Sequence, residues 1–279
     1  MANQQSQRQL TPMQVFNTKI KDVRMQEYLS SILGERKGQF VTTLVSVVAN
    51  NEQLQQCEPM SVVYAALKAA SLGLAVDPNL GYSALIPYRN TKANKTECQF
   101  QVMKNGFVEL AMRSGQVVSI VNEVVHEGEL VKKNKFTGDY EFDEDKKISD
   151  KVIGYMAYIR LSNGFEKTLY WTVEECDAHA KRYSQTYKKG YGQWKDNFEA
   201  MALKTVLKLL LSKYAPKSVE MQNAILSDQA TFDENGKATY IDGPEEQEQP
   251  KSLEEAVEKQ KEEMRANAQS GDATKEDLP

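Results

Sequence analysis

The first quarter of the chain has apolar residues at the spacing of amphipathic helices. Thr11 and Pro12 are typical of an N-cap and a first helical residue, and the apolar positions that follow predict one or two helices ending near Gly34. Pro59 and Gly73 are typical of the start of another helix and of the position just past its end. The helices predicted after Gly34 cover residues 39–50 and 60–72.

Beyond residue 80 the apolar positions change to the alternation of β-strands. Asn163 and Gly164 are typical of a hairpin turn, while Thr172 and Glu175 form a capping box that begins a helix ending near Tyr183. The remaining predicted elements are helices over 104–114 and 194–214, a loop over 184–193, and strands over 82–88, 97–103, 117–127, 130–136, 152–161 and 165–171. This order predicts an α+β fold, with an antiparallel sheet and its hairpins packed on helices.

The 279-residue chain is 41% apolar and 27% charged, which is enough apolar material for a substantial core. It has no run of 18 apolar residues, so no membrane span is expected, and its polar first nine residues do not resemble a secretory signal. Its three cysteines lie far apart in the sequence, which is typical of a reducing compartment rather than of a disulfide framework. We therefore expect a cytoplasmic protein.

The net charge of −4 conceals two unlike parts. From Asp228 to the end there are 15 acidic and 6 basic residues, whereas the rest of the chain has 24 acidic and 29 basic residues. A basic body with an acidic tail indicates a nucleic-acid partner. We expect an N-terminal arm and helix over residues 1–34, a core over 35–220, and a flexible acidic C-terminal tail over 221–279 with a short helix near 252–267.

Several common catalytic signatures are absent from the sequence. There is no G-x-x-x-x-G-K-[ST] phosphate-binding loop and no G-x-S-x-G nucleophile motif. The two histidines, His126 and His179, are too few for most histidine-based metal sites. Carboxylates crowd residues 139–145, which is more typical of a solvated loop, with metal-dependent hydrolysis as the alternative. We expect no catalytic residue, no metal and no cofactor.

Basic residues concentrate between residues 178 and 217, where nine lysine and arginine residues oppose only two acids, Asp196 and Glu199. Aromatic residues are interleaved with them. Basic groups neutralise phosphates and aromatic faces stack on bases, so we expect this segment to bind nucleic acid; the alternative is a solvated helix face. Trp194 is either a stacking platform or an anchor in the core, and the usual burial of tryptophan favours the core. The candidate DNA-binding residues here are Lys181, Arg182, Lys188, Lys189, Trp194, Lys204, Lys208 and Lys213.

A second basic set lies earlier in the chain and is a further candidate for binding nucleic acid. Its candidate residues are Arg89, Lys92, Lys104 and Arg113. Lys104 stands at a predicted strand-to-helix junction, where free backbone N–H groups can bind an anion. A plain helix start and ordinary surface charges are the alternatives for this set.

Three segments together resemble the RecT family of phage and prophage single-strand DNA annealing proteins. They contain SVVYAALKAASLGLAVDP at residues 61–78, QVMKNGFVELAMRSGQ at 101–116 and WKDNFEAMALKT at 194–205. Each segment alone is a weak signal, but the combination is specific and spans about residues 39–216. Within this family, the chain resembles RecT proteins of Gram-positive prophages.

The resemblance implies an α+β strand-annealing fold and ATP-independent annealing of complementary strands in phage recombination. It also implies an oligomeric ring or filament that holds DNA phosphates in a basic groove, where Arg89, Lys104 and Arg113 would line the opposite wall. The implied partners are single-stranded DNA, the annealed duplex, further copies of the chain, and, through the C-terminal tail, a phage 5′-to-3′ exonuclease and the host single-strand-binding protein. The implied location is the cytoplasm of a bacterial host. A passive single-strand coat and a metal-dependent nuclease component are the alternatives.

Overall fold

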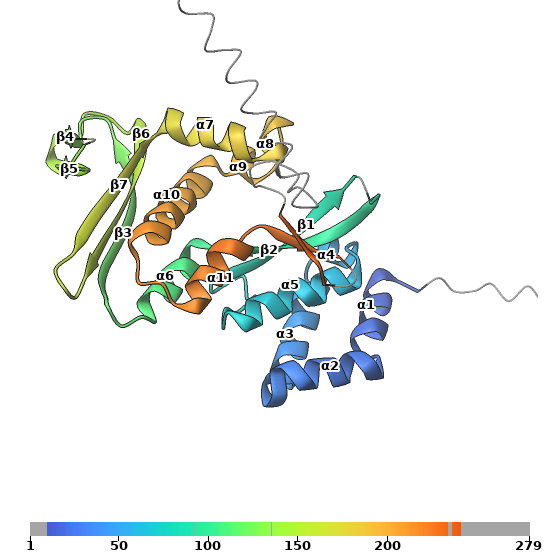
Figure 1. Ribbon diagram of the computed structural model, residues 1–279. Coiled ribbons are helices and arrows are strands. Elements are labelled where there is room, and N and C mark those ends of the chain that lie inside the picture. The colour runs from blue at the N-terminus through green and yellow to red at the C-terminus, as the bar shows by residue number, and fades with distance from the viewer. Residues whose placement is uncertain (1–9, 92, 135, 234–235, 241–279) are drawn as a thin grey trace, which may run out of the picture. The chain divides into compact units, whose positions relative to one another are not determined.

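Helices make up the N-terminal part of the computed structural model, which describes residues 10–91, 93–134, 136–233 and 236–240 (Figure 1). Thr11 is the N-cap of the first helix, as predicted, and it forms a capping box with Gln14. Asp22 caps the next helix through its carboxylate, which separates the first two helices. The helices are α1 (Pro12–Ile20), α2 (Val23–Leu33), α3 (Lys37–Ala49), α4 (Glu52–Gln55) and α5 (Pro59–Ser71), with a 3₁₀ turn at Gly34–Arg36.

The first two helices belong to the main core of the protein. Phe16, Ile20 and Leu29 are fully buried and pack in the same apolar cluster as the side chains of α5 and the sheets. The described part of the expected N-terminal arm is therefore continuous with the body. All described residues fall in one unit, which ends at Asp242.

Four antiparallel strands form the first sheet, in the order β1-β2-β8-β9 (Figure 1). β2 packs against α5, and its Cys98, Phe100 and Val102 are fully buried in the core. Because side chains alternate along a strand, Gln99 and Gln101 of β2 point to the opposite face. The strands of this sheet are β1 (Ser83–Asn90), β2 (Lys95–Val102), β8 (Ala230–Phe232) and β9 (Ala238–Tyr240).

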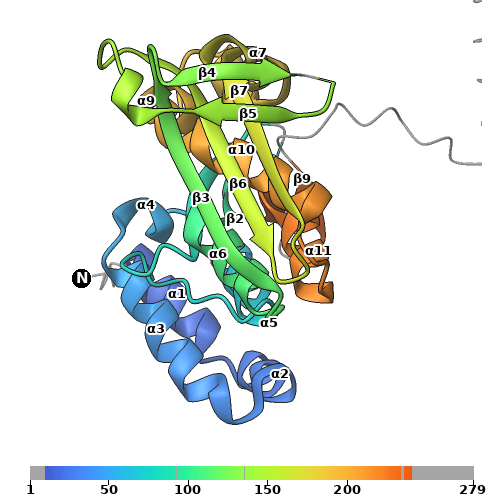
Figure 2. The ribbon, with the colours of Figure 1, turned by 90° about the vertical axis from the view of Figure 1, so that its left-hand side faces the viewer.

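A second antiparallel sheet has the order β3-β6-β7, and the long helix α10 packs against it (Figures 1 and 2). Ala157 and Ile159 of its central strand are fully buried. The predicted hairpin turn lies between the last two strands, with Gly164 at a φ of +85°. The strands are β3 (Val117–His126), β6 (Val152–Leu161) and β7 (Glu166–Thr172), and a separate hairpin consists of β4 (Leu130–Asn134) and β5 (Asp139–Phe142).

The helices of the C-terminal half follow the sequence pattern in part, since a short helix at Gln185–Lys188 lies in the loop predicted over 184–193 and the helix at Val219–Ser227 was not predicted. The capping box of Thr172 and Glu175 begins α7, as predicted. The helix predicted over 194–214 is broken at Asn197, whose φ of −138° and ψ of 56° lie outside the helical region. The helices are α6 (Lys104–Met112), which connects the two sheets, α7 (Val173–Tyr183), α8 (Gln185–Lys188), α9 (Gln193–Asp196), α10 (Phe198–Tyr214) and α11 (Val219–Ser227), with a 3₁₀ turn at Glu144–Lys146.

The structured body extends past residue 221, where the acidic tail was expected to begin. α11 runs through that position and the β8–β9 hairpin follows it, and β8 pairs with β2 through Gln99 with Thr231 and Phe100 with Ala230. The side chains of β8 are buried, and its backbone pairs with the otherwise free edge of β2. The partners are distant in the sequence, so the local pattern held no sign of the pairing. The helix expected near 252–267 lies outside the described residues.

This arrangement confirms the predicted α+β fold, in which antiparallel strands and their hairpins pack on helices. Within the described ranges, no helix is long and apolar enough to cross a membrane.

Candidate nucleic-acid interface

A groove separates one face of β1 and β2 from helices α8, α9 and α10. It consists of two adjoining hollows with cavity volumes of about 330 and 160 Å³. Both are lined by Ser184, Trp194, Met201 and Gln229. The lining of the larger hollow also includes Ile86, Tyr88, Arg89, Gln99, Gln101, Thr186, Tyr191, Gly192 and Gln193. The lining of the smaller hollow also includes His179, Tyr183, Lys204, Lys208 and Asp228.

Uncharged amides form the floor of the larger hollow. Gln99 and Gln101 are only 6% and 7% exposed. Gln101 Nε2 donates to Gln99 Oε1 at 2.8 Å, and Gln99 Nε2 donates to the backbone carbonyl of Gln229 at 2.8 Å. A glutamine amide has two N–H donors and an oxygen with two lone pairs, so these bonds orient the amides without exhausting them.

The loop between α8 and α9 forms the facing wall of the larger hollow. Gly192 has a φ of +91°, and a Cβ at this position would lie 2.8 Å from Thr186 Oγ1, so a glycine is required. The backbone N–H of Tyr191 donates to the carbonyl of Thr186 at 3.1 Å, which tightens the loop further. The Tyr191 side chain remains 55% exposed at the hollow.

Trp194 stands between the two hollows within a cluster of aromatic rings. It is 5% exposed, and its ring meets that of Phe198 edge-on with the centres 5.5 Å apart. This burial agrees with the interpretation of Trp194 as a core anchor. His179 also contacts it, and burial, together with the charges of Lys208 and Arg182, lowers the pKa of His179. The imidazole is therefore neutral at pH 7.

Lys204 and Lys208 share one internal counterion. Lys204 Nζ lies 3.1 Å from Asp228 Oδ1, and Lys208 Nζ lies 2.8 Å from Asp228 Oδ2. Burial disfavours a charged carboxylate, but the two ammonium groups outweigh it and hold the pKa of Asp228 below its ordinary value. Lys204 is only 5% exposed. The structure therefore places it as an internal ion-pair partner rather than as the phosphate clamp suggested by the sequence, whereas Lys208 is partly accessible from the smaller hollow.

Arg113 and Lys104, which were expected on the opposite wall, have bonds within the fold. The guanidinium of Arg113 donates to the carbonyls of Leu72 and Gly73, both at 2.9 Å, and so ties α6 to the end of α5. Lys104 Nζ lies 3.4 Å from the carbonyl oxygen of Asn122. Neither residue lines the groove.

Arg89 is the member of this second basic set that the structure places at the groove. Its side chain is exposed at the larger hollow and donates a hydrogen bond to Asn94 in the same hairpin. Lys92, in the loop of that hairpin, lies outside the described residues.

The remaining predicted cations lie on exposed surfaces. Lys188 and Lys189 are exposed beside the loop that carries Tyr191. Lys181 is paired with Asp177 at 2.6 Å. Arg182 lies over the ring of Tyr183, and Lys213 is exposed near the end of α10, away from both hollows.

The buried glutamines are the groove residues that the sequence reasoning missed. A signal was present, because Gln99 and Gln101 alternate with Cys98, Phe100 and Val102 in a strand. Polar residues on the second face of such a strand indicate a face that is not part of the apolar core. Gln229 gave no comparable signal, since it reaches the floor only through the pairing of β8 with β2.

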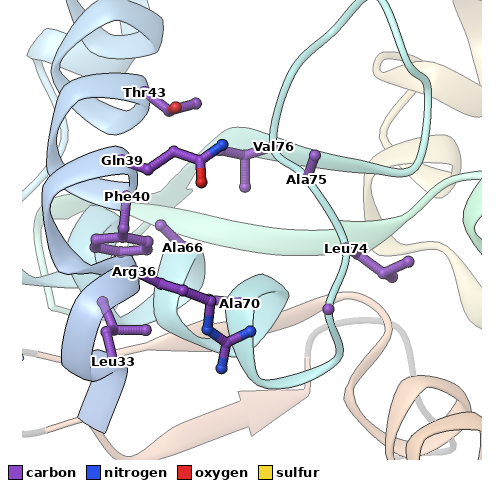
Figure 3. A pocket seen from close by; sticks show the side chains of 11 residues that line it. Leu33, Arg36, Gln39, Phe40, Thr43, Ala66, Ala70, Leu74, Ala75 and Val76 are labelled. Atoms are coloured by element: carbon purple, nitrogen blue, oxygen red, sulfur yellow. The ribbon is translucent and has the colours of Figure 1, made fainter.

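A separate hollow of about 240 Å³ lies between α3, α5 and residues 73–76 (Figure 3). Its lining is apolar or small except for Arg36, Gln39 and Thr43, and Figure 3 shows the Arg36 guanidinium extending toward Ala70. No candidate DNA-binding residue lines this hollow. Among the described residues, no group of three His, Cys, Asp or Glu side chains is arranged to hold a metal ion.

The chain is similar to one known protein family and to two known proteins. The RecT family profile matches residues 38–242, which run from the start of α3 to the end of the body. The uncharacterized protein YqaK of Bacillus subtilis is 44% identical over 200 residues, which cover 72% of this chain and 67% of that protein. Protein RecT of Escherichia coli is 30% identical over 228 residues, which cover 75% of this chain and 78% of that protein.

Proposed function

Since this chain belongs to the RecT family, we propose that it binds single-stranded DNA in the groove and anneals complementary strands without ATP. Membership of the family supports DNA binding and strand annealing in recombination. The location of the DNA, the independence from ATP and the form of the assembly are the parts that we add.

The observation that carries this proposal is the division of the groove into a charged rim and a neutral floor. Arg89 lies on one rim, and Lys188 and Lys189 lie beside the other, where cations can bind phosphates and release counterions. Lys208 offers a further partly accessible cation in the smaller hollow. Contacts to phosphates read no sequence, which suits a protein that pairs any two complementary strands.

The bound strand would be held along its phosphates, and most of its bases would face outward for pairing with a second strand. Lys181 and Arg182 would extend the phosphate track along α7. Lys213 would contact DNA only where the track continues past α10, and Lys92 where it passes the tip of the β1–β2 hairpin.

The proposed assembly is a ring or helical filament of copies, in which the grooves of neighbouring protomers align into one track. Such an assembly holds both the single strand and the annealed duplex. We propose further that the acidic tail binds a phage 5′-to-3′ exonuclease and the host single-strand-binding protein, and that the protein works in the bacterial cytoplasm. The proposed chemistry uses no cofactor and no catalytic residue.

The deciding experiment is the annealing of two labelled complementary oligonucleotides by the full-length protein, in EDTA and without ATP. We expect pairing to be faster than in the protein-free control, with both strands intact. Binding without faster pairing would indicate a passive single-strand coat. Strand degradation that requires added Mg²⁺ would indicate a nuclease component, and either result would overturn the proposal.

A further inference from the structure

The larger hollow has a chemistry that phosphate binding does not use. Its floor has no net charge, because Gln99 and Gln101 meet there with the carbonyl of Gln229. A pocket built only for phosphate would need N–H groups or cations at its base, since phosphate oxygens only accept hydrogen bonds. An amide floor with both donors and acceptors fits a ligand that itself has both.

We infer that the larger hollow binds a single unstacked nucleobase of the bound strand, one for each protomer. This inference rests on the proposed function, and it adds a base-binding site to a track that otherwise holds phosphates. The ligand would be a nucleotide whose base lies between β2 and the α8–α9 loop while its phosphates remain at the basic rim.

The size and depth of the hollow suit this ligand. A cavity of about 330 Å³ lies at the lower end of the range for small-molecule sites, about 300–1,000 Å³. Gln99 and Gln101 are more than nine-tenths buried, and their hydrogen bonds to each other and to Gln229 use only part of the capacity of each amide, which can take additional partners. A base with its own donors and acceptors would provide those partners.

The walls supply the surfaces on which a base can stack or pack. Tyr191 is 55% exposed on the α8–α9 loop, and Tyr88 and Pro87 line the β1 side. Aromatic side chains stack on any base, since every base has a π-face. The required glycine at position 192 holds this loop close to Thr186 and so fixes the position of Tyr191 beside the opening.

The amide floor also explains how such a site would tolerate every sequence. The hydrogen bonds to Gln99 Oε1 and to the Gln229 carbonyl fix both amides, and each fixed amide has a second N–H donor as well as oxygen lone pairs for a ligand. Each of the four bases presents some combination of donor and acceptor on its pairing edge. The site would therefore bind a base without selecting one, as an annealing protein requires.

The test compares two oligonucleotides of equal length and charge, oligo-dT and an abasic strand with the same phosphates. For the wild-type protein at fixed salt, we expect the abasic strand to bind about tenfold more weakly, since base stacking on an aromatic side chain is worth roughly that factor or more. Tyr191→Ala should reduce this ratio toward one. Tyr28→Ala, which removes another exposed tyrosine on α2 far along the chain from the groove, should leave the ratio unchanged.

The outcomes separate the inference from the proposed function. Equal affinity for both strands would overturn the base site while the phosphate track stands, and an unchanged ratio in Tyr191→Ala would also overturn it. Failure to bind either strand would overturn both.

Photocrosslinking gives a second measurement that needs no variant. A single 5-iododeoxyuridine in oligo-dT would be irradiated with the full-length protein, and the crosslinked peptide identified by mass spectrometry. We expect attachment at Tyr191 or Tyr88. Crosslinks confined to peptides outside the larger hollow would overturn the inference.

Discussion

The ammonium group of Lys204 and the carboxylate of Asp228 form an ion pair of 3.1 Å inside the protein, with both side chains almost completely buried. The same carboxylate also accepts a hydrogen bond from the backbone N–H of Val102 at 3.0 Å. It therefore joins α10, the end of β2 and the start of β8 at one point. The pair holds the floor of the groove against its helical wall.

We expect Asp228→Asn to destabilise the protein by about 3–5 kcal/mol, because removing one partner leaves a buried charge without compensation. Chemical denaturation followed by circular dichroism measures this change. Asp150→Asn is the matched control, since its exposed pair with Lys147 lies on the surface and should contribute little. Equal midpoints for the Asp228→Asn variant and the wild type would contradict the role of the pair.

The free energy of unfolding should depend on pH through the ionisation of the Asp228 carboxylate. The pKa of Asp228 is lower in the folded protein than its ordinary value of 3.8, so the ionised form stabilises the fold at every pH above that value. The contribution is lost as the pH falls below about 4 and through the folded pKa. The stability difference between wild type and Asp228→Asn should therefore narrow toward pH 2. A difference that stays constant between pH 6 and pH 2 would contradict the assignment.

Two helical glycines should respond in opposite ways to alanine. A Cβ on Gly106, in α6, would lie 2.0 Å from the carbonyl oxygen of Tyr82, so Gly106→Ala must displace backbone and should strongly lower the thermal midpoint. A Cβ on Gly38, in α3, meets nothing within 4 Å, and Gly38→Ala should stabilise the protein by about 0.5–1 kcal/mol. Thermal melts of both variants decide this, and a tolerated Gly106→Ala would show that the contact between α6 and Tyr82 is loose.

Replacing Lys188 and Lys189 together by glutamine should weaken single-strand binding and lower its dependence on salt. Each lost phosphate contact reduces the slope of log affinity against log salt by about 0.7, so the double variant should lose about 1.4. Fluorescence anisotropy titrations at several salt concentrations measure the slope. The control replaces Lys19 and Lys21, which are also exposed but lie on and just after α1. The same slope for all three proteins would remove Lys188 and Lys189 from the phosphate track.

The three cysteines should resist thiol reagents in the native state. Burial, with a smaller effect of neighbouring Glu58 and Glu175 respectively, raises the pKa of Cys57 and of Cys176 to about 12. Burial likewise raises the pKa of Cys98. The thiolate is the reacting species, so the thiols of the native protein at pH 8 should react slowly with the reagent. The fully unfolded protein should consume three equivalents of reagent, one for each cysteine. Rapid native reaction would indicate that the core opens easily.

Local signals in the sequence predicted most of the elements, and longer-range contacts account for the differences. The caps at Thr11 and Thr172 depend on neighbours three residues away, so the pattern contained everything needed to place them. The pairing of β8 with β2 depends instead on contacts between distant segments. Such contacts produce no periodic pattern of apolar residues in the sequence.

The candidate site divides in the same way. Basic residues are dense in the segment that includes the helical wall of the groove, but this density could not distinguish Lys188 on the surface from Lys204 in the interior. That distinction depends on Asp228, whose charge the sequence reasoning assigned to the acidic tail. Arg113 is a basic residue of the kind that binds DNA, but its guanidinium donates hydrogen bonds to the carbonyls of Leu72 and Gly73 and so ties α6 to the end of α5.

The pairing of β8 with β2 also determines when the protein can function during its synthesis. β8, which ends at Phe232, must be translated before β2 can pair with it. Only then can Gln229 complete the floor of the larger hollow. A nascent chain that ends earlier has an unpaired edge on β2 and a Lys204 without its counterion. Contacts between such distant residues form late in folding. The growing polypeptide therefore completes the groove only after residue 232 has been translated, and a product that terminates earlier should be a substrate for chaperones and proteases.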